Sequence, residues 1–81
     1  MTNSRDAILR QIGLRIVQRR EALGLRQKDL AERLGVAQTA ISPMEHGERN
    51  LTIDTICRLA DALETTFTDL VFGTEPPAPR Q

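Results

Sequence analysis

Apolar residues recur along this chain at helical spacing, and no segment shows the alternation typical of a β-strand. The first segment, "SRDAILRQIGLRIVQRREALG", places Ile8, Ile12 and Ile16 at four-residue intervals. Ser4 is a suitable N-cap, and Gly24 is a typical residue just beyond a helix C-terminus. The pattern therefore predicts a long first helix that begins at Ser4 and ends at Gly24.

Three later segments show the same periodicity. "QKDLAERLG" predicts a helix that ends at Gly35 and turns Leu30, Ala31 and Leu34 to one face. "TIDTICRLADAL" predicts another, with Thr52 as N-cap and a single apolar stripe. That stripe consists of Ile53, Ile56, Leu59, Ala60 and Leu63. Thr66 and Asp69 resemble a capping box for a short last helix through Leu70, Val71 and Phe72.

Residues 37–50, "AQTAISPMEHGERN", contain a helix breaker in an otherwise helical pattern. Pro43 has no N–H for the carbonyl of Thr39, and its ring crowds that carbonyl, at a cost of ~3 kcal/mol in a regular helix. Ser42-Pro43-Met44-Glu45 also fits a capping box that would begin a helix at Pro43, although Gly47 leaves it barely one turn. We predict a third helix from about Gln38 to Glu45, distorted or broken near Pro43.

The chain is therefore predicted to be all-α, with five helices in one domain over residues 1–72. The segment "GTEPPAPRQ", residues 73–81, is Pro-rich and polar and is predicted to be a disordered tail. There is no Trp or Tyr and there are only two Phe, so the core must be aliphatic. No long apolar run predicts a signal peptide or a membrane span. A single cysteine allows no internal disulfide, and we expect a reducing, cytoplasmic location.

Charge is unevenly distributed although the formal net charge is zero. Residues 1–50 hold nine Lys and Arg against six Asp and Glu, whereas residues 51–81 hold two against five. A neutral chain does not simply coat nucleic acid. The N-terminal part can still attract a polyanion.

The spacing between Gln27 and Ile41 fits a helix-turn-helix. A small residue, Ala31, lets two helix axes approach, Gly35 can adopt the positive φ of the turn, and Ile41 closes the junction. Leu30 and Val36 complete this small core. An ordinary helical hairpin is the alternative explanation.

The segment "GLRQKDLAERLGVAQTAISPMEHGERNLTIDTICRLADAL" resembles the five-helix, lambda-repressor-like domain of the phage-repressor and Cro class (XRE-like) of bacterial transcriptional regulators. The resemblance extends from about Ile12 to Leu70. Within this class, "GERNLT" also resembles the small controller proteins of restriction–modification systems. The resemblance implies a repressor-like protein that binds double-stranded DNA.

The resemblance also implies roles for individual residues. Base-reading positions are Gln38, Thr39, Ser42 and Pro43, and Pro43 could at most contact a thymine methyl. DNA-backbone positions are Gln27, Arg26, Lys28, His46, Arg49 and Asn50. Arg20 and Glu45 match an internal ion pair between the first and third helices. Pro43, Ala37 and Arg19 depart from the family pattern, in which Arg19 is often Leu.

Other chemistry is poorly supported. His46 is best explained as a cation near a helix C-terminus, because no second His could complete a metal site. Cys57 is expected to be a small buried hydrophobe or partly exposed, and no base marks it as a nucleophile. We therefore expect no enzyme activity, cofactor, metal or small-molecule ligand.

The sequence thus predicts a sequence-specific regulator of transcription that acts as a homodimer on a palindromic operator. One monomer reaches half a site, so two recognition helices should lie ~34 Å apart. We expect an acidic and apolar dimer surface from the end of the fourth helix and from Leu70, Val71 and Phe72. Two other functions remain open: the antitoxin of a toxin–antitoxin pair, and a protein-interaction module without DNA binding.

Overall fold

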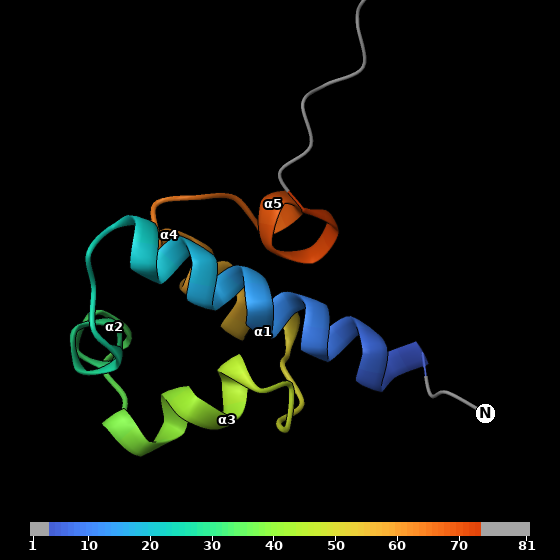
Figure 1. The fold of residues 1–81 in the computed structure, drawn as a ribbon, viewed down its shortest axis with the longest axis horizontal. Helices are drawn as coiled ribbons and strands as arrows, with labels where there is room; N and C mark the ends of the chain where they lie inside the picture. The colour runs from blue at the N-terminus through green and yellow to red at the C-terminus, as the bar shows by residue number, and fades with distance from the viewer. Residues whose placement is uncertain (1–3, 74–81) are drawn as a thin grey trace, which may run out of the picture.

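The computed structural model describes residues 4–73, and over that range the regular structure is helical. The elements are α1 (Ser4–Ala22), α2 (Gln27–Leu34), the 3₁₀ turn η1 (Gln38–Ala40), α3 (Ile41–Glu45), α4 (Ile53–Ala62) and α5 (Phe67–Phe72). In Figure 1, α1 crosses the molecule, with α3 below it and α5 above it. The predicted all-α fold with five α-helices is confirmed. The domain boundary after residue 72 stays a prediction, since residues 74–81 lie outside the described range.

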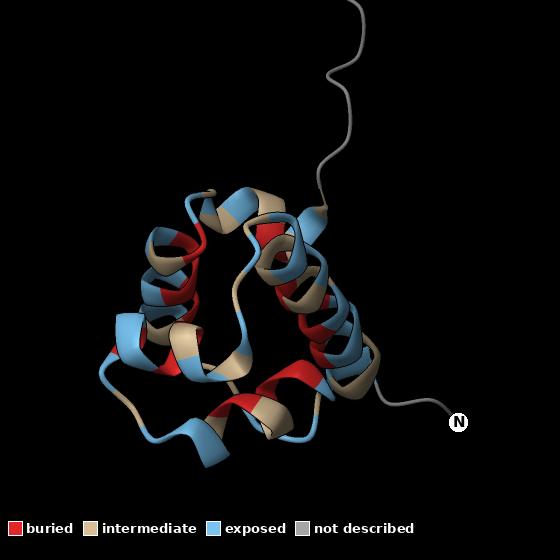
Figure 2. Ribbon diagram, turned by 60° about the vertical axis from the view of Figure 1, so that its left-hand side comes forward, coloured by how far each residue is buried: buried red, intermediate tan, exposed pale blue. Residues whose placement is uncertain are grey.

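All five helices contribute to an aliphatic core, as the composition predicts. Figure 2 shows the buried positions, in red, turned toward the interior of the molecule. The core residues are Ile12, Ile16, Leu30, Ala31, Leu34, Ile41, Met44, Ile56, Leu59, Ala60, Leu63 and Leu70. Their burial against one another is the main favourable contribution to folding.

Two predicted core positions are wrong. Ile8 is 51% exposed and the neighbouring Leu9 is buried instead. A helix turns about 100° per residue, so Ile8 lies about 80° from the direction of Ile16, whereas Leu9 lies within about 20° of it. Ile53 is 70% exposed. It is the first residue of α4. The spacing of apolar residues does not show whether another helix packs against this first turn.

The predicted helix ends are largely confirmed. Gly24 and Gly35 adopt φ values of 72° and 71°, just beyond α1 and α2. Thr52 Oγ1 accepts a hydrogen bond from Thr55 N at 3.1 Å, and Thr66 Oγ1 accepts one from Asp69 N at 3.0 Å. The second half of the predicted Thr66 capping box does not form, because the Asp69 carboxylate accepts from Thr65 Oγ1 instead. Ser4 already lies within α1 and is not its N-cap.

Two glycines let α1 approach α3 at backbone distance. A Cβ added at Gly13 would meet the carbonyl oxygen of Glu45. Gly47 has φ 70°, and a Cβ there would lie 2.7 Å from Arg10 Cα. The α1–α3 pair is therefore closely packed, and α3 is seated directly on the longest helix of the domain.

We expect Gly13→Ala to lower the free energy of unfolding by about 1–3 kcal/mol, because the new methyl group would push the two backbones apart. The sign of this change in the free energy of unfolding shows whether the backbones of α1 and α3 are in contact. In a helix without this neighbour, Gly→Ala stabilises by about 0.5–1 kcal/mol. Chemical denaturation of both proteins measures the difference, and an increase in stability would show that α1 and α3 are not in backbone contact.

Candidate nucleic-acid interface

The helix-turn-helix geometry predicted from the spacing is present. Ala31 and Ile41 are buried between α2 and the following segment. Gly35 takes the left-handed conformation at the turn, and Val36 N donates to the Ala31 carbonyl at 3.0 Å. The chain therefore leaves α2 by a tight turn and presents η1 and α3 beside it.

The distortion associated with Pro43 lies in the residues that precede it, whereas Pro43 itself is part of a regular α-helix. Residues 38–40 form the 3₁₀ turn η1, in which Ala40 N donates to the Ala37 carbonyl at 3.0 Å. Pro43 lies in the first turn of α3, where a backbone N–H has no partner within the same helix. The predicted helix from about Gln38 to Glu45, distorted or broken near Pro43, is thus present as two pieces, η1 and α3. The alternative helix start with Ser42 as its cap is wrong, because Ser42 is a helical residue of α3.

The four proposed base-reading residues differ in exposure. Gln38 and Thr39 are exposed on η1, whereas Ser42 and Pro43 are half-buried on α3. The ring nitrogen Nδ1 of His46 lies 2.8 Å from the Ser42 carbonyl oxygen, to which it donates, and 3.2 Å from Ser42 Oγ. Gln38 and Thr39 are therefore the side chains most available to a ligand at the start of this segment.

A polar network around Glu45 holds this segment on the core. Arg20 Nε donates to Glu45 Oε2 at 2.6 Å, and Gln27 Nε2 donates to Glu45 Oε1 at 2.8 Å. The side chains of Arg20 and Glu45 are 13% and 4% exposed. Arg20 also donates to the carbonyl of Leu25 at 2.9 Å. The predicted ion pair is confirmed, and it joins α1, α2 and α3.

Gln27 has a structural role that the sequence did not predict. The sequence assigned its amide to a DNA phosphate, yet the side chain is half-buried and one of its N–H groups is used by Glu45. Contact between Gln27 and DNA stays a prediction. What the structure establishes is that Gln27 connects the start of α2 to the end of α3.

The other proposed backbone contacts lie on the surface. Arg26 is exposed but pairs with Asp29, with 3.2 Å between Nε and Oδ2. This guanidinium, together with the Arg26 backbone N–H, lowers the pKa of Asp29, and the same pair raises the pKa of Arg26. Because the pKa of Asp29 falls on folding, the pair stabilises the start of α2 above the ordinary carboxyl range and is lost in acid.

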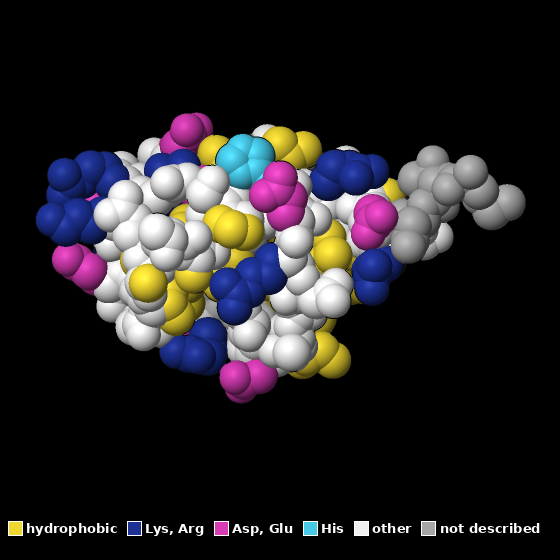
Figure 3. All heavy atoms as spheres, turned by 90° about the horizontal axis from the view of Figure 1, so that it is seen from below, with side chains coloured by type: hydrophobic (Ala, Val, Ile, Leu, Met, Phe, Trp, Pro, Cys, Tyr) yellow, Lys and Arg dark blue, Asp and Glu magenta, His cyan; other side chains and the backbone are white. Residues whose placement is uncertain are grey.

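Lys28, Arg49 and Asn50 are exposed, and none of their side chains has a hydrogen bond or ion pair within residues 4–73. The face seen in Figure 3 carries dark blue Lys and Arg side chains on both sides of the single histidine, in cyan. Acidic side chains, in magenta, are interspersed among them. The candidate interface thus offers separate cations around η1 and α3 rather than a continuous basic patch.

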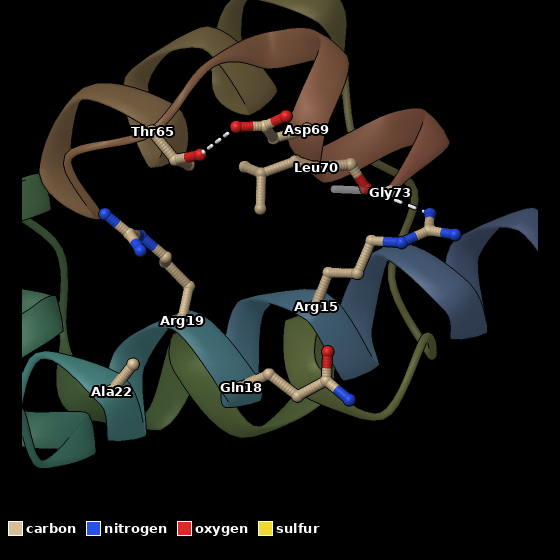
Figure 4. Close-up of a pocket in the computed structure, with 8 residues that line it drawn as sticks. All are labelled: Arg15, Gln18, Arg19, Ala22, Thr65, Asp69, Leu70 and Gly73. Atoms are coloured by element: carbon tan, nitrogen blue, oxygen red, sulfur yellow. Dashed lines mark hydrogen bonds between the residues drawn. The ribbon is translucent and has the colours of Figure 1, made fainter. Parts of the chain in front are cut away.

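Several other arginines are bound to helix ends, which the sequence did not predict. Arg15 donates to the Val71 carbonyl at 2.7 Å, and Arg19 donates to the Leu63 and Glu64 carbonyls at 2.9 and 2.8 Å. In Figure 4 both side chains reach from α1 across a hollow of about 410 Å³ toward α5 and the turn before it. Arg19, the departure from the family pattern, thereby connects α1 to the α4–α5 turn.

The same use of arginine occurs at α2 and α4. Arg58 donates to the Leu34 carbonyl at 2.7 Å, and Arg33 donates to the Ala62 carbonyl at 2.8 Å and to the Glu64 carboxylate at 3.1 Å. Cations are favourable beside the carbonyls at a helix C-terminus. The basic excess of residues 1–50 is therefore used partly to join helices, and only a part of it faces solvent.

The three proposed dimer residues differ in burial. Leu70 is 1% exposed and belongs to the core, so its assignment to a dimer surface is wrong. Val71 is half-buried, and Phe72 is 68% exposed. The short α5 must turn one side of its apolar run inward, and this side is the one with Leu70.

The remaining predicted features can be stated briefly. Cys57 is exposed, so the expectation of a buried cysteine is wrong and the partly exposed alternative holds. Among residues 4–73, no cluster of three or more His, Cys, Asp and Glu is placed to hold a metal ion. No helix in this range has the length and apolar character needed to span a membrane.

Comparison with known proteins agrees with this geometry. A helix-turn-helix family model matches residues 16–70, which include the turn, η1 and α3. The chain belongs to the helix-turn-helix family of transcriptional regulators. The "uncharacterized HTH-type transcriptional regulator y4dJ" of Sinorhizobium fredii is 34% identical over 64 residues, which cover 79% of this chain and 83% of that protein. The sequence-based family assignment is thus confirmed.

Two solved structures resemble this helix-turn-helix protein closely. The restriction-modification controller protein C.AhdI from Aeromonas hydrophila is 34% identical, with a TM-score of 0.74 over 79% of this chain and 97% of that one. The P22 c2 repressor, solved in complex with a synthetic operator, is 33% identical, with a TM-score of 0.71 over 78% of this chain and 96% of that one. In both comparisons the match includes nearly the whole of the solved chain.

Proposed function

We propose that this helix-turn-helix protein is a cytoplasmic regulator that binds a palindromic DNA operator as a homodimer. The observation that carries the proposal is the segment η1–α3. It displays Gln38 and Thr39 to solvent while its other end is held on α1 and α2 through Glu45. A polar surface displayed from a rigid support is what base recognition needs.

The chemistry of the displayed side chains suits the major groove of DNA. A Gln amide can pair with N6 and N7 of adenine, and the Thr hydroxyl or methyl can meet a base edge or a thymine methyl. Lys28, Arg49 and Asn50 are available on the flanks for phosphate oxygens. The P22 c2 repressor, which shares this fold, is bound to an operator in its own structure, and this supports the assignment.

Within this class we propose a narrower role, control of a restriction–modification operon. Its support is the identity of 34% with the controller protein C.AhdI across 97% of that chain. A second controller protein, C.Esp1396I, was solved as a tetramer on its natural operator of 35 base pairs. This supports the proposal that the operator of this protein binds more than one dimer.

Selection of DNA from a random pool by the purified protein tests the proposal. We expect a palindromic consensus whose half-sites are separated by one helical turn, ~34 Å between recognition segments. A band-shift titration on the selected sequence should then show binding as a dimer. If no sequence is enriched and no duplex is shifted at low salt, the protein is not a DNA-binding regulator, and a protein-interaction role takes its place.

Two single variants should separate base contacts from phosphate contacts. We expect Arg49→Ala to weaken binding about equally on all sequences and to lower the slope of log K against log[salt] by ~1. Gln38→Ala should leave that slope unchanged and relax preference at one position of each half-site, by about 1–3 kcal/mol. Fluorescence anisotropy at several salt concentrations measures both. The opposite pattern would exchange the roles of these residues.

A further inference from the structure

A groove of about 640 Å³ lies between the first half of α1 and the loop that follows α3. Its walls include Arg5 and Arg10 from α1, and His46, Arg49 and Asn50 from the end of α3 and the loop. The groove exists because Gly47 allows the loop to approach α1 at Arg10, where any side chain at residue 47 would collide. Cations from two segments far apart in sequence thus line the same groove.

Arg10, like Arg49 and Asn50 across the chain, lines this groove without engaging its charged or polar group in the fold. Its side chain is exposed, and within residues 4–73 it has no hydrogen bond or ion pair. In contrast, Arg15, Arg19 and Arg20 on the same helix are all bound to carbonyl or carboxylate oxygens. Arg10 therefore carries a charge that the described part of the chain does not satisfy.

The charges that line the groove leave a cationic excess. Asp6 is beside Arg5, with 3.7 Å between Arg5 Nε and Asp6 Oδ1, and Glu48 is an exposed acid of the loop. Arg10 lines the groove from α1 and Arg49 lines it from the loop after α3, and His46 lies at the end of α3. Figure 3 shows dark blue and magenta side chains close to His46 (cyan), on the face that also displays α3.

We propose that this groove holds the phosphate backbone of one DNA strand, contacted by Arg10 from α1 and by Arg49 from the loop after α3. The inference rests on the proposed function, because it places the contact beside the base-reading segment. It extends the DNA interface from the helix-turn-helix to the first half of α1. The base-reading and backbone contacts proposed above all lie outside α1. Arg10 is then a phosphate-binding residue, and Glu48 weakens binding through its negative charge.

Salt-dependent anisotropy on the selected operator tests the groove with the full chain. We expect Arg10→Gln to weaken binding on all sequences and to lower the salt slope by ~1, as one phosphate contact is lost. Arg10→Lys should restore the parent slope, because it keeps the charge. Glu48→Gln should tighten binding. The matched control is Arg33→Gln, an exposed arginine of α2 whose guanidinium binds the Ala62 carbonyl at the end of α4. This variant should leave the salt slope unchanged.

The outcomes separate this inference from the proposed function. If the parent binds DNA and Arg49→Ala lowers the slope while Arg10→Gln does not, the groove is not a phosphate site although the protein remains a DNA-binding regulator. If Arg10→Gln changes sequence preference instead, Arg10 contacts bases and the phosphate assignment is wrong. If the parent binds no duplex, the proposed function itself fails. Circular dichroism should show the same helix content for every variant.

Discussion

Glu45→Ala is expected to destabilise the domain by about 3–5 kcal/mol, because it leaves the largely buried guanidinium of Arg20, 13% exposed, without its carboxylate. The carboxylate accepts from both Arg20 and Gln27, and its side chain is 4% exposed. In a domain of this size each kcal/mol lowers the melting temperature by about 4–8 °C, so the change should exceed 10 °C. Thermal melting followed by circular dichroism measures it.

Two further variants show whether the loss of stability in Glu45→Ala comes from an unpaired charge. The double variant Arg20→Met with Glu45→Leu removes both charges and keeps apolar volume, and it should recover most of the stability. Glu45→Gln keeps an acceptor without the charge and should fall between the parent and Glu45→Ala. If Glu45→Ala melts within error of the parent, the pair is solvated and does not hold α3.

The second large effect is expected at the dimer surface. Phe72→Asp should produce a folded monomer whose operator affinity is lower by about 100-fold or more, because two linked half-site contacts become independent. Phe72 is 68% exposed, so the charge enters solvent in the monomer and the core remains intact. In a two-fold dimer each Phe72 would face the same patch of the second chain, and two buried carboxylates would repel.

Sedimentation equilibrium and band shifts measure these changes. The matched control is Leu14→Asp, which places the same charge at another exposed apolar residue, on the long helix α1. It should leave the dimer mass unchanged. A parent protein that is monomeric at micromolar concentration, or a Phe72→Asp protein that remains dimeric, would show that this end of α5 is not the interface.

The helices themselves were predictable from short stretches of sequence, because the signals that begin and end them are local. Thr52 and Thr66 can bind backbone N–H groups only two or three residues away, and Gly35 adopts its left-handed conformation without help from distant residues. The Arg20–Glu45 pair was also foreseen, through the resemblance to a family whose fold is shared. The position of the helix-turn-helix within the chain followed from the same local spacing.

What only the tertiary structure decided is which side of each helix meets another helix. Ile8 and Leu9 are adjacent and both apolar, yet only Leu9 is buried; Leu70 and Phe72 differ in the same way. Arg19 and Arg10 are both basic residues of α1, yet one binds the α4–α5 turn and the other faces the groove beside Gly47. Burial and long side-chain contacts depend on how whole helices pack, and a periodic pattern specifies a face only to within a fraction of a turn. The residues that face DNA or a second chain are those that this packing leaves outside.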